Sequence, residues 1–337
     1  MKNVNIGIAS FAHMHAYSYL NVLLNLESVD VVGFCDLNQD RKKKIKNDYN
    51  IPSFPTYEKL AEQSDIDVIL ITTETVNHVH VAIAALENGK HVIIEKPIAT
   101  TLEDAELMIN TAKKHGMKLF QCYPCRYHPS AQRVKQLAEK NQLGEILGIT
   151  ATNHGCMPNH RNPEFQWFSD KELAGGGAVM DHTTHAADLI FWFTGWTPKS
   201  IYGVAKRLFN DEINSDDAGM VLMNFSNEKA ASIDPSWSRP VSFPTWGDLN
   251  MMIYGSERTV MVDMFNQNFE IYSRSKSGKT ATWQPFGSDI DYVMLKSYMN
   301  ALVGDENPPV TGMDGLKALK VALKAYESNE KKEVVEW

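Results

Sequence analysis

The sequence predicts an α/β protein made of two regions with different patterns. Over residues 1–122, short apolar runs alternate with helical patterns, which is typical of a doubly wound parallel sheet covered by helices on both faces. From residue 123 onward, period-two segments separated by short turns predict a large, mostly antiparallel open sheet in a second α/β domain. At 337 residues the chain is long enough for two such domains, which we place at residues 1–122 and 123–337.

Composition and charge exclude several classes of function. The formal net charge is -8 and the pI is about 5.8, whereas a protein that binds nucleic acid needs a basic face. No apolar stretch approaches the roughly 18 residues of a membrane span, and residues 1–10 lack the apolar core of a signal peptide. We therefore expect a cytoplasmic protein with a small-molecule partner and with no nucleic-acid or membrane partner.

The first region is organised around residues 89–97, of sequence GKHVIIEKP. The short apolar run between Gly89 and Pro97 predicts a buried strand that ends at Glu95 and Lys96. In an open α/β sheet the carboxyl ends of the strands face the crevice where ligands bind, so Lys96 is well placed to meet a ligand. On spacing alone, a lysine that only pairs with Glu95 is an equally good interpretation.

The remaining strands of this sheet are predicted at residues 4–9, 31–35, 68–72 and 118–122. Asp36 follows the second strand, at the position where a nucleotide-binding fold places the acid that binds the adenosine ribose, and this acid favours NAD over NADP. The first turn, SFAHMH at residues 10–15, has small side chains at Ser10 and Ala12 but none of the three glycines of a dinucleotide fingerprint. Taken alone, this turn is a weak signal.

The second region contains seven segments that predict strands, at residues 145–153, 200–208, 218–224, 229–236, 249–254, 259–263 and 269–273. Such a sheet needs helices on one face, and the candidates are residues 178–193, 292–302 and 315–328. A face left bare would be covered by another subunit. We therefore expect a homodimer or homotetramer that forms through this sheet.

Several motifs resemble those of the Gfo/Idh/MocA oxidoreductase family, and the resemblance covers nearly the whole chain. The most specific is AALENGKHVIIEKP at residues 84–97, which is similar to the family's AGKHVxxEKP signature. Supporting matches are His78, RYHP at residues 126–129, GGG at residues 175–177, DHTTH at residues 181–185 and PVT at residues 309–311. The resemblance implies an N-terminal Rossmann-type NAD(P)-binding domain and a C-terminal α/β domain for substrate binding and oligomerisation.

The resemblance also implies an activity and a cofactor site. It indicates a dehydrogenase or reductase that acts on CH–OH groups of a small polyhydroxylated substrate, namely a sugar, a cyclitol or a sugar derivative. NAD is the expected cofactor, and NADP is the less favoured one. The implied cofactor-binding residues are Ser10, Phe11, Ala12, His13, Met14, Asp36, Thr73, Thr75, His78, Glu95, Lys96 and Arg126.

Hydride transfer from a carbinol carbon requires a base for the hydroxyl proton and a positive charge near the developing alkoxide. The resemblance assigns the charge, together with a substrate contact, to Lys96. Asp181 and His185 are four residues apart, which places both on one helix face within reach of a common ligand. They match the family's D-x-x-x-H, so His185 would accept the proton and Asp181 would orient the substrate or share that task. A capping or packing role is the alternative for this pair.

The histidines between residues 154 and 185 leave a metal site open as an alternative. His154, His160, Asp181, His182 and His185 together offer enough ligands for a zinc ion. We expect no metal, because acid/base chemistry already explains the one pair spaced four residues apart, and we expect His154 to contact substrate. His182 lies about 100° round the helix from Asp181, so we expect it to face elsewhere.

Two other functions are compatible with the same fold. The altered first turn suggests a non-catalytic nucleotide-binding sensor or regulator, because fold does not fix function. The presence of Lys96, Asp181 and His185 together favours an enzyme instead. A redox-cycling, NAD-dependent glycosidase or lyase has a similar architecture and differs only in its products.

Overall fold

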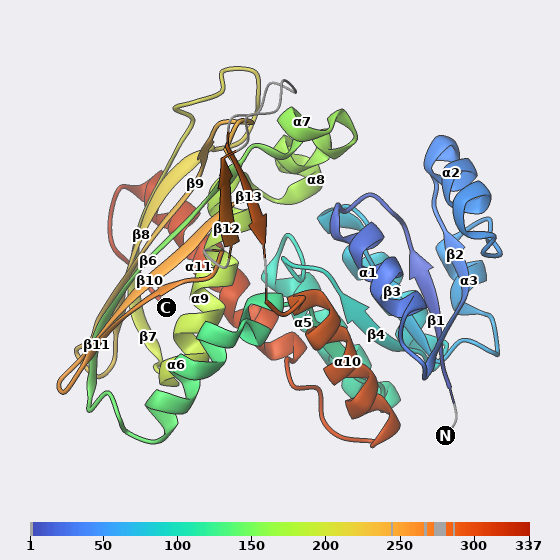
Figure 1. Ribbon diagram of the computed structural model, residues 1–337, viewed down its shortest axis with the longest axis horizontal. Helices are drawn as coiled ribbons and strands as arrows, with labels where there is room; N and C mark the ends of the chain where they lie inside the picture. Colours follow the sequence, from blue (N-terminus) through green and yellow to red (C-terminus); the bar gives the residue numbers. More distant parts are fainter. Residues whose placement is uncertain (1–2, 244, 266–267, 273–280, 286) are drawn as a thin grey trace. The chain divides into compact units, whose positions relative to one another are not determined.

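Figure 1 shows the computed structural model, which describes residues 3–243, 245–265, 268–272, 281–285 and 287–337. The chain divides into two compact units. The first unit comprises Met1–Pro124, Glu164–Gly175 and Ile290–Lys320, and the second comprises Cys125–Pro163, Gly176–Asp289 and Val321–Trp337. No pattern in the sequence indicated that residues 164–175 and 290–320 pack with the first region.

The first unit contains a parallel sheet, as the alternating pattern predicts, and this sheet has five strands. Its strands are β1 (Val4–Ala9), β2 (Val29–Cys35), β3 (Val68–Ile71), β4 (His91–Ile94) and β5 (Leu119–Gln121). They pair in the order β2-β1-β3-β4-β5, and every pair is parallel. The order reverses between β1 and β3, which makes the carboxyl ends of these two strands the expected crevice for a ligand.

Helices pack on this sheet. The helices of the first unit are α1 (His15–Leu24), α2 (Gln39–Tyr49), α3 (Tyr57–Ala61), α4 (His78–Glu87), α5 (Leu102–His115) and α10 (Ile290–Val303), with the 3-10 turn η1 (Thr75–Asn77) before α4. Helix α4 packs against α3, α5, β3 and β4, whereas α1 packs against α10 and β2.

The prediction that residues 292–302 cover the large sheet is wrong. This helix, α10, packs instead against α1 and β1 of the first unit. It buries Met294, Leu295, Tyr298 and Met299, and the Tyr298 hydroxyl donates to the carbonyl oxygen of Gln121 at the end of β5 (2.5 Å). An apolar face predicts that a helix is buried but carries no information about which sheet buries it.

The second unit contains a seven-stranded sheet in the order β11-β10-β6-β9-β8-β7-β14. Its strands are β6 (Ile146–Cys156), β7 (Pro198–Lys206), β8 (Ala218–Phe225), β9 (Ala230–Arg239), β10 (Gly247–Gly255), β11 (Thr259–Asp263) and β14 (Val335–Glu336). Its pairs are antiparallel except β6 with β9, so the expected mostly antiparallel sheet is confirmed. The segment predicted at 269–273 forms β12 (Asn268–Tyr272), which pairs separately with β13 (Ala281–Pro285), and Ser273 lies outside the described residues.

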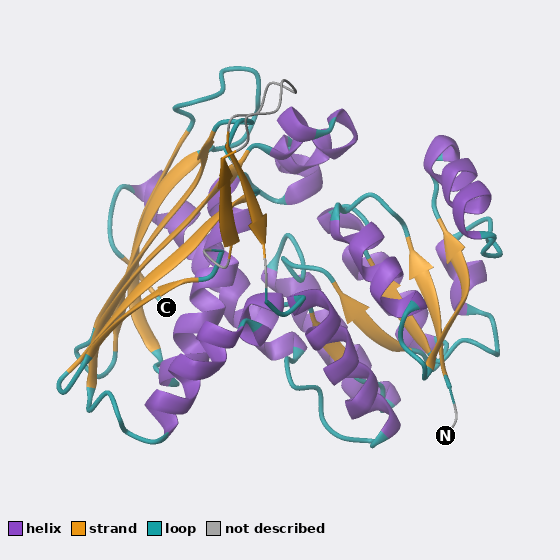
Figure 2. Cartoon of the chain, viewed as in Figure 1, coloured by secondary structure: helices purple, strands orange, loops and turns teal. Residues whose placement is uncertain are grey.

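Helix α9 (Ala178–Thr194) covers the centre of one face of this sheet, and Figure 2 shows it beside the strands. It packs against β6, β8, β9 and α6 (Pro129–Glu139). The end of α11 (Gly312–Lys331) lies against β7, where a Cβ on Gly203 would come within 2.5 Å of the backbone of Ala325. Within the residues that the structure describes, we find no helix that is both long and apolar enough to span a membrane.

Candidate active site

Glu95 and Lys96 lie at the carboxyl edge of the parallel sheet, directly after β4, as the sequence predicts. Their strand is fully buried, with no exposed surface on Val92, Ile93 or Ile94. Glu95 is also fully buried, and Lys96 is only 5% exposed. Charged side chains are rarely this buried unless they are paired or functional.

Cationic groups surround the Glu95 carboxylate. His15 Nδ1 lies 2.9 Å from Oε1, and His13 Nε2 lies 3.8 Å from Oε2. The backbone N–H of Lys96 also donates to Oε2 (2.8 Å). Burial acts to raise the pKa of Glu95, but the charges of His13, His15 and Lys96 outweigh it and hold this pKa well below the usual range. Glu95 is therefore a buried carboxylate that stays ionised.

The first turn reproduces the backbone of a glycine turn without a glycine. Ser10 has a φ of 75°, in the left-handed region that costs a non-glycine residue about 1–3 kcal/mol. Hydrogen bonds hold it there: Ser10 N donates to Cys35 O (2.7 Å), and Thr72 Oγ1 donates to Ser10 O (2.6 Å). The Ser10 hydroxyl in turn accepts from Ala12 N (3.1 Å). These hydrogen bonds thus stabilise a left-handed backbone conformation that glycine would adopt without strain.

Asp36 ties this turn to the end of β2. The residue is fully buried, and its Oδ2 accepts from Phe11 N (2.7 Å), Ser10 Oγ (3.3 Å) and Arg41 Nε (3.0 Å). Its Oδ1 accepts from Asn38 N (2.8 Å). Asp36 lies directly after β2, where the sequence places it, and these contacts show that it fixes the conformation of the first turn. Its contact with a ribose stays a prediction.

Other predicted cofactor residues follow β3. Thr73, Thr75 and His78 are buried. His78 Nδ1 lies 3.2 Å from the carbonyl oxygen of Ile98, to which it donates, and burial lowers the pKa of His78 despite its hydrogen bonds to carbonyl groups. The ring is therefore neutral, and its buried Nε2 is an acceptor that has no hydrogen-bond partner among the residues described. An orphaned acceptor at this edge fits a ligand with hydroxyl or amide donors, such as a dinucleotide.

A segment from later in the chain covers the first turn. Trp167, in the 3-10 turn η3 (Pro163–Ser169), donates its Nε1–H to the carbonyl oxygen of Ala12 (3.1 Å). Its ring stacks on Phe168 at 3.9 Å between centroids, and Phe168 lies 5.1 Å from the His13 ring. Met14 packs against the same aromatic cluster. This segment buries His13 beside Glu95.

Helix α9 begins at a close approach between two backbones. A Cβ on Gly177 would lie 1.8 Å from the carbonyl oxygen of Asp216, so only glycine fits there. The Asp216 carboxylate accepts from Gly177 N (3.1 Å) and Val179 N (2.7 Å), and it also accepts from the Tyr326 hydroxyl (2.6 Å). Asp216 thus satisfies the first donors of α9. Sequence reasoning missed this cap because Asp216 is distant in the chain.

Asp181 lies in the first turn of α9 and is 8% exposed. Its Oδ2 accepts from Trp237 Nε1 (3.1 Å) and lies 3.3 Å from His182 Nε2, while His182 Nδ1 lies 2.9 Å from the carbonyl oxygen of Asn153. The expectation that His182 faces away from Asp181 is wrong, because the lengths of the two side chains bridge the 100° between their Cβ directions. His185 follows one turn later and is partly exposed.

His154 lies on the other face of the large sheet. Side chains along β6 point alternately to the two faces of the sheet. A Cβ added to Gly155 would lie 2.8 Å from the His182 ring, so position 155 points toward α9. His154 therefore points away from α9. Its Nε2 lies 3.2 Å from Asp234 Oδ1, and its Nδ1 lies 3.6 Å from Asp248 Oδ1. The structure does not bring His154 to Asp181 and His185.

Arg126 forms a buried ion pair in the second unit. Its Nε donates to Asp188 Oδ2 (2.8 Å) and its Nη2 to Asp188 Oδ1 (2.5 Å). The guanidinium also lies 5.6 Å from the centre of the Trp192 ring. These contacts give Arg126 a structural role within this unit, in which a bidentate pair fixes α9.

The ligand atoms of His13, His15 and Glu95 all lie within 4.8 Å of one another, the spacing of a potential metal group. No comparable group was found among His154, His160, Asp181, His182 and His185 in the described part of the chain. His13 Nδ1 accepts the N–H of His15 (3.2 Å), so the proton of a neutral His13 is on Nε2, the atom that faces Glu95.

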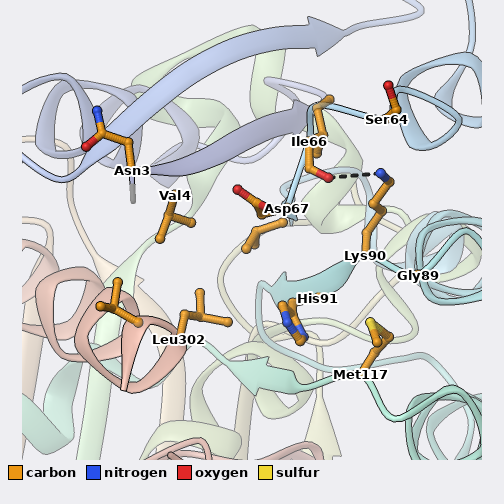
Figure 3. Close-up of a pocket in the computed structure, with 12 residues that line it drawn as sticks. Asn3, Val4, Ser64, Ile66, Asp67, Gly89, Lys90, His91, Met117 and Leu302 are labelled. Carbon is orange, nitrogen blue, oxygen red and sulfur yellow. Dashed lines mark hydrogen bonds between the residues drawn. The ribbon is translucent and has the colours of Figure 1, made fainter. Parts of the chain in front are cut away.

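Figure 3 shows a cavity of about 540 Å³ at the other edge of the parallel sheet. Val4, Val68 and His91, which begin β1, β3 and β4, line it. The Lys90 ammonium donates to the carbonyl oxygen of Ile66 beside it (2.9 Å). Since this cavity lies at the amino ends of the strands, it is separate from the carboxyl edge that carries Lys96.

Comparisons with known proteins agree with this architecture. A myo-inositol 2-dehydrogenase of Thermotoga maritima is 23% identical over 98% of this chain and 96% of its own length. A UDP-N-acetylglucosamine 3-dehydrogenase of Acidithiobacillus ferrooxidans is 26% identical over 96% of this chain and 95% of its own. The crystal structure of GenD2 from gentamicin A biosynthesis in complex with NAD matches with a TM-score of 0.90 at 20% identity, covering 100% of this chain and 97% of that one.

Family models match most of the chain. Residues 2–123 match the oxidoreductase family with an NAD-binding Rossmann fold, and residues 131–261 match the GFO/IDH/MocA C-terminal domain. The expected fold class and the expected NAD-dependent enzyme acting on CH–OH groups are thereby confirmed. The chain belongs to the GFO/IDH/MocA family of NAD-dependent oxidoreductases.

Proposed function

We propose that this enzyme transfers a hydride between the nicotinamide of NAD and a secondary alcohol or ketone of a sugar, a cyclitol or a sugar derivative. The observation that carries the proposal is a buried lysine, Lys96, at the carboxyl edge of an NAD-binding sheet. A lysine at that edge supplies the positive charge that a developing alkoxide requires. The second unit supplies a carboxylate and an imidazole one helical turn apart, in Asp181 and His185.

The names of the relatives support this substrate class. They include an inositol dehydrogenase and a sugar-nucleotide dehydrogenase, and a 1,5-anhydro-D-fructose reductase of Ensifer adhaerens is 22% identical over 87% of each chain. All of these substrates carry several hydroxyl groups on one ring. Asp181, with Trp237 and His182 beside it, is suited to accept a hydrogen bond from such a ring.

Each residue has one proposed role in the oxidation. Bound NAD supplies the acceptor for the hydride that leaves the carbinol carbon. His185 takes the hydroxyl proton, Asp181 accepts a hydrogen bond from a neighbouring hydroxyl, and the Lys96 ammonium stabilises the alkoxide. Ketone reduction follows the same steps in reverse.

The proposed NAD-binding residues lie at the carboxyl edge of the parallel sheet. We propose that the first turn, residues 10–14, together with Asp36, Thr73, Thr75 and His78, holds NAD, and that Glu95 and Lys96 complete the site. Asp36 favours NAD over NADP, because a carboxylate repels a 2′-phosphate. Arg126, which pairs with Asp188, stays a proposed cofactor residue, whereas His154 is left out because it lies on the face of the large sheet that points away from Asp181.

A screen with the purified enzyme tests the proposal. Sugars, cyclitols and their acids are incubated with NAD, and NADH is followed by fluorescence while products are identified by mass spectrometry. We expect NADH to accumulate with at least one substrate, in step with a product lighter by two hydrogen atoms. Cleavage or elimination without net NADH formation would contradict the proposal and identify a redox-cycling enzyme.

We further propose that the enzyme forms a homodimer or homotetramer through the open face of the large sheet. The strand registers place one row of uncharged side chains across this face: Tyr202, Leu222, Ser232, Thr150, Met252 and Met261. Leu222 is 41% exposed and Met261 is 76% exposed, although both belong to strands of a packed sheet. An exposed row of uncharged side chains that includes Tyr202, Leu222 and Met261 is a candidate surface for another subunit. Light scattering should show an oligomer for the wild type and a smaller species for Leu222→Arg, and a monomeric wild type would refute the proposal.

A further inference from the structure

The first turn of the Rossmann unit contains two histidines, and one of them, His15, stands where a dinucleotide fingerprint has a glycine. His15 is the first residue of α1, at the position of the third glycine of the fingerprint. Its Nδ1 lies 2.9 Å from Glu95 Oε1, and its side chain is 30% exposed. His13 is almost fully buried behind it and lies on the same carboxylate. His15 is thus the member of this cluster that is open to a ligand.

The surroundings of His15 favour its charged form. Glu95, Lys96 and His13 face it from the carboxyl edge, Tyr19 lies one turn along α1 with its hydroxyl 3.4 Å from Nδ1, and Asp291 comes from α10. Burial raises the pKa of Tyr19 well above its usual value, so Tyr19 stays neutral. Burial and the charge of Lys96 lower the pKa of His15, but the charge and hydrogen bond of Glu95, with the charge of Asp291, outweigh them and leave that pKa raised.

The first turn itself offers few free donors to an anion. In a dinucleotide-binding Rossmann domain the pyrophosphate lies at the amino end of the first helix, where the glycines expose backbone N–H groups. Here the N–H of Phe11 is bonded to Asp36, that of Ala12 to Ser10 Oγ, and that of His15 to His13 Nδ1. A side-chain donor at the start of α1 would replace these backbone donors.

We propose that His15, held by Glu95, is a pyrophosphate-binding residue of the NAD site, and that its imidazolium makes NAD affinity depend on pH. The helix dipole adds to this site by favouring the bound anion, since the amino end of α1 carries partial positive charge. Glu95 fixes the ring through Nδ1 and keeps the charge, and Nε2–H is left to donate to the phosphate oxygens. The inference rests on the NAD-binding family match and not on the proposed substrate.

Equilibrium binding of NADH and of ADP-ribose, followed by calorimetry from about pH 6 to about pH 9, tests the inference without a substrate. Because His15 binds best when charged, the wild-type Kd should be constant at low pH and rise as pH passes the raised pKa of His15. His15→Gln should weaken both ligands about tenfold at low pH and remove most of this rise, as expected for loss of a charged hydrogen bond. Adenosine, which has no phosphate, should bind equally to both proteins.

Two further variants separate a direct role of His15 in binding from a structural one. His80→Gln is the matched control, since His80 forms a similar pair with Glu58 on the surface (2.7 Å), and it should behave like the wild type. Glu95→Gln removes the charge that raises the pKa of His15, so the rise in Kd should move to lower pH. A purely structural role for His15 would not produce that shift.

Two results would overturn the proposal. One is a pH dependence of NADH binding that is the same in His15→Gln as in the wild type, when the two proteins also unfold at the same temperature. The other is stoichiometric zinc binding that competes with NADH and is lost in His15→Gln. The second result would assign His13, His15 and Glu95 to a metal site instead.

Discussion

Glu95 in the parallel-sheet unit and Asp181 in the large-sheet unit both contact a histidine, and the two pairs differ in their surroundings. Glu95 is fully buried and lies beside His13, His15 and Lys96, and of these His15 has a side chain that is 30% exposed. Asp181 accepts from Trp237, and its partner His182 is only 5% exposed. In the first pair the histidine is open to a ligand, whereas in the second the histidine is enclosed.

The difference suggests that the two histidine–carboxylate pairs have separate roles. The His182 ring lies between two acceptors, with Nδ1 2.9 Å from the carbonyl oxygen of Asn153 and Nε2 3.3 Å from Asp181 Oδ2, so it cannot turn without losing one of these contacts. His182 is therefore a positioning residue that holds Asp181 in one orientation. His15 instead presents a charge at the end of a helix. We expect changes in the first pair to alter cofactor affinity and changes in the second to alter turnover.

The largest effect is expected for Lys96→Met. Lys96 adjoins Glu95 but acts on a charge that is present only as the transition state develops, so kcat should fall roughly 100-fold or more. NADH affinity should fall far less than kcat, because Lys96 is only one of the residues proposed to hold NAD. Steady-state kinetics on the substrate found in the screen, together with an NADH titration, measure both. Lys59→Met, which alters an exposed pair with Glu62, is the control, and near-normal kcat in Lys96→Met would place the catalytic charge elsewhere.

A smaller effect is expected for His182→Leu. This variant removes one of the contacts that orient Asp181, and kcat should fall about tenfold, as for loss of a charged hydrogen bond. His154→Leu is a matched control, because it breaks a histidine–aspartate contact on the opposite face of the same sheet. If both variants lose the same activity, the effect comes from the stability of the sheet and not from Asp181.

The smallest effect concerns the backbone of the first turn. Ser10 holds a φ of 75°, so Ser10→Ala loses the hydroxyl and keeps the strain, whereas Ser10→Gly loses the hydroxyl together with the Cβ that causes the strain. Ser10→Gly should be about 1 kcal/mol more stable than Ser10→Ala in the free energy of unfolding, measured with urea. Equal stabilities would mean that the turn relaxes when the side chain is removed.

Sequence reasoning succeeded where the signal was local. The strand that ends at Glu95 and Lys96 was predicted from a short apolar run between Gly89 and Pro97, and β4 lies there. The spacing of Asp181 and His185 likewise placed both residues on α9. These predictions depend on periodicity and turn chemistry, which neighbouring residues determine.

The predictions that failed, and the features that were missed, depend on contacts between distant segments. The helix at residues 292–302 was assigned to the wrong sheet, because an amphipathic pattern does not identify its partner. Contact of His15 with Glu95 joins residues 80 apart in the chain, and the cap of α9 comes from Asp216. His182 was misplaced because the helical wheel gives the direction of Cβ and not the reach of the side chain.

One measurement tests most directly whether the two pairs have separate roles. NADH is titrated into the wild type, His15→Gln and His182→Leu at about pH 6. The account predicts that His182→Leu binds NADH as tightly as the wild type, while His15→Gln binds it about tenfold more weakly. Equal weakening in both variants, or unchanged affinity in His15→Gln, would contradict the assignment of the two histidine–carboxylate pairs to separate roles.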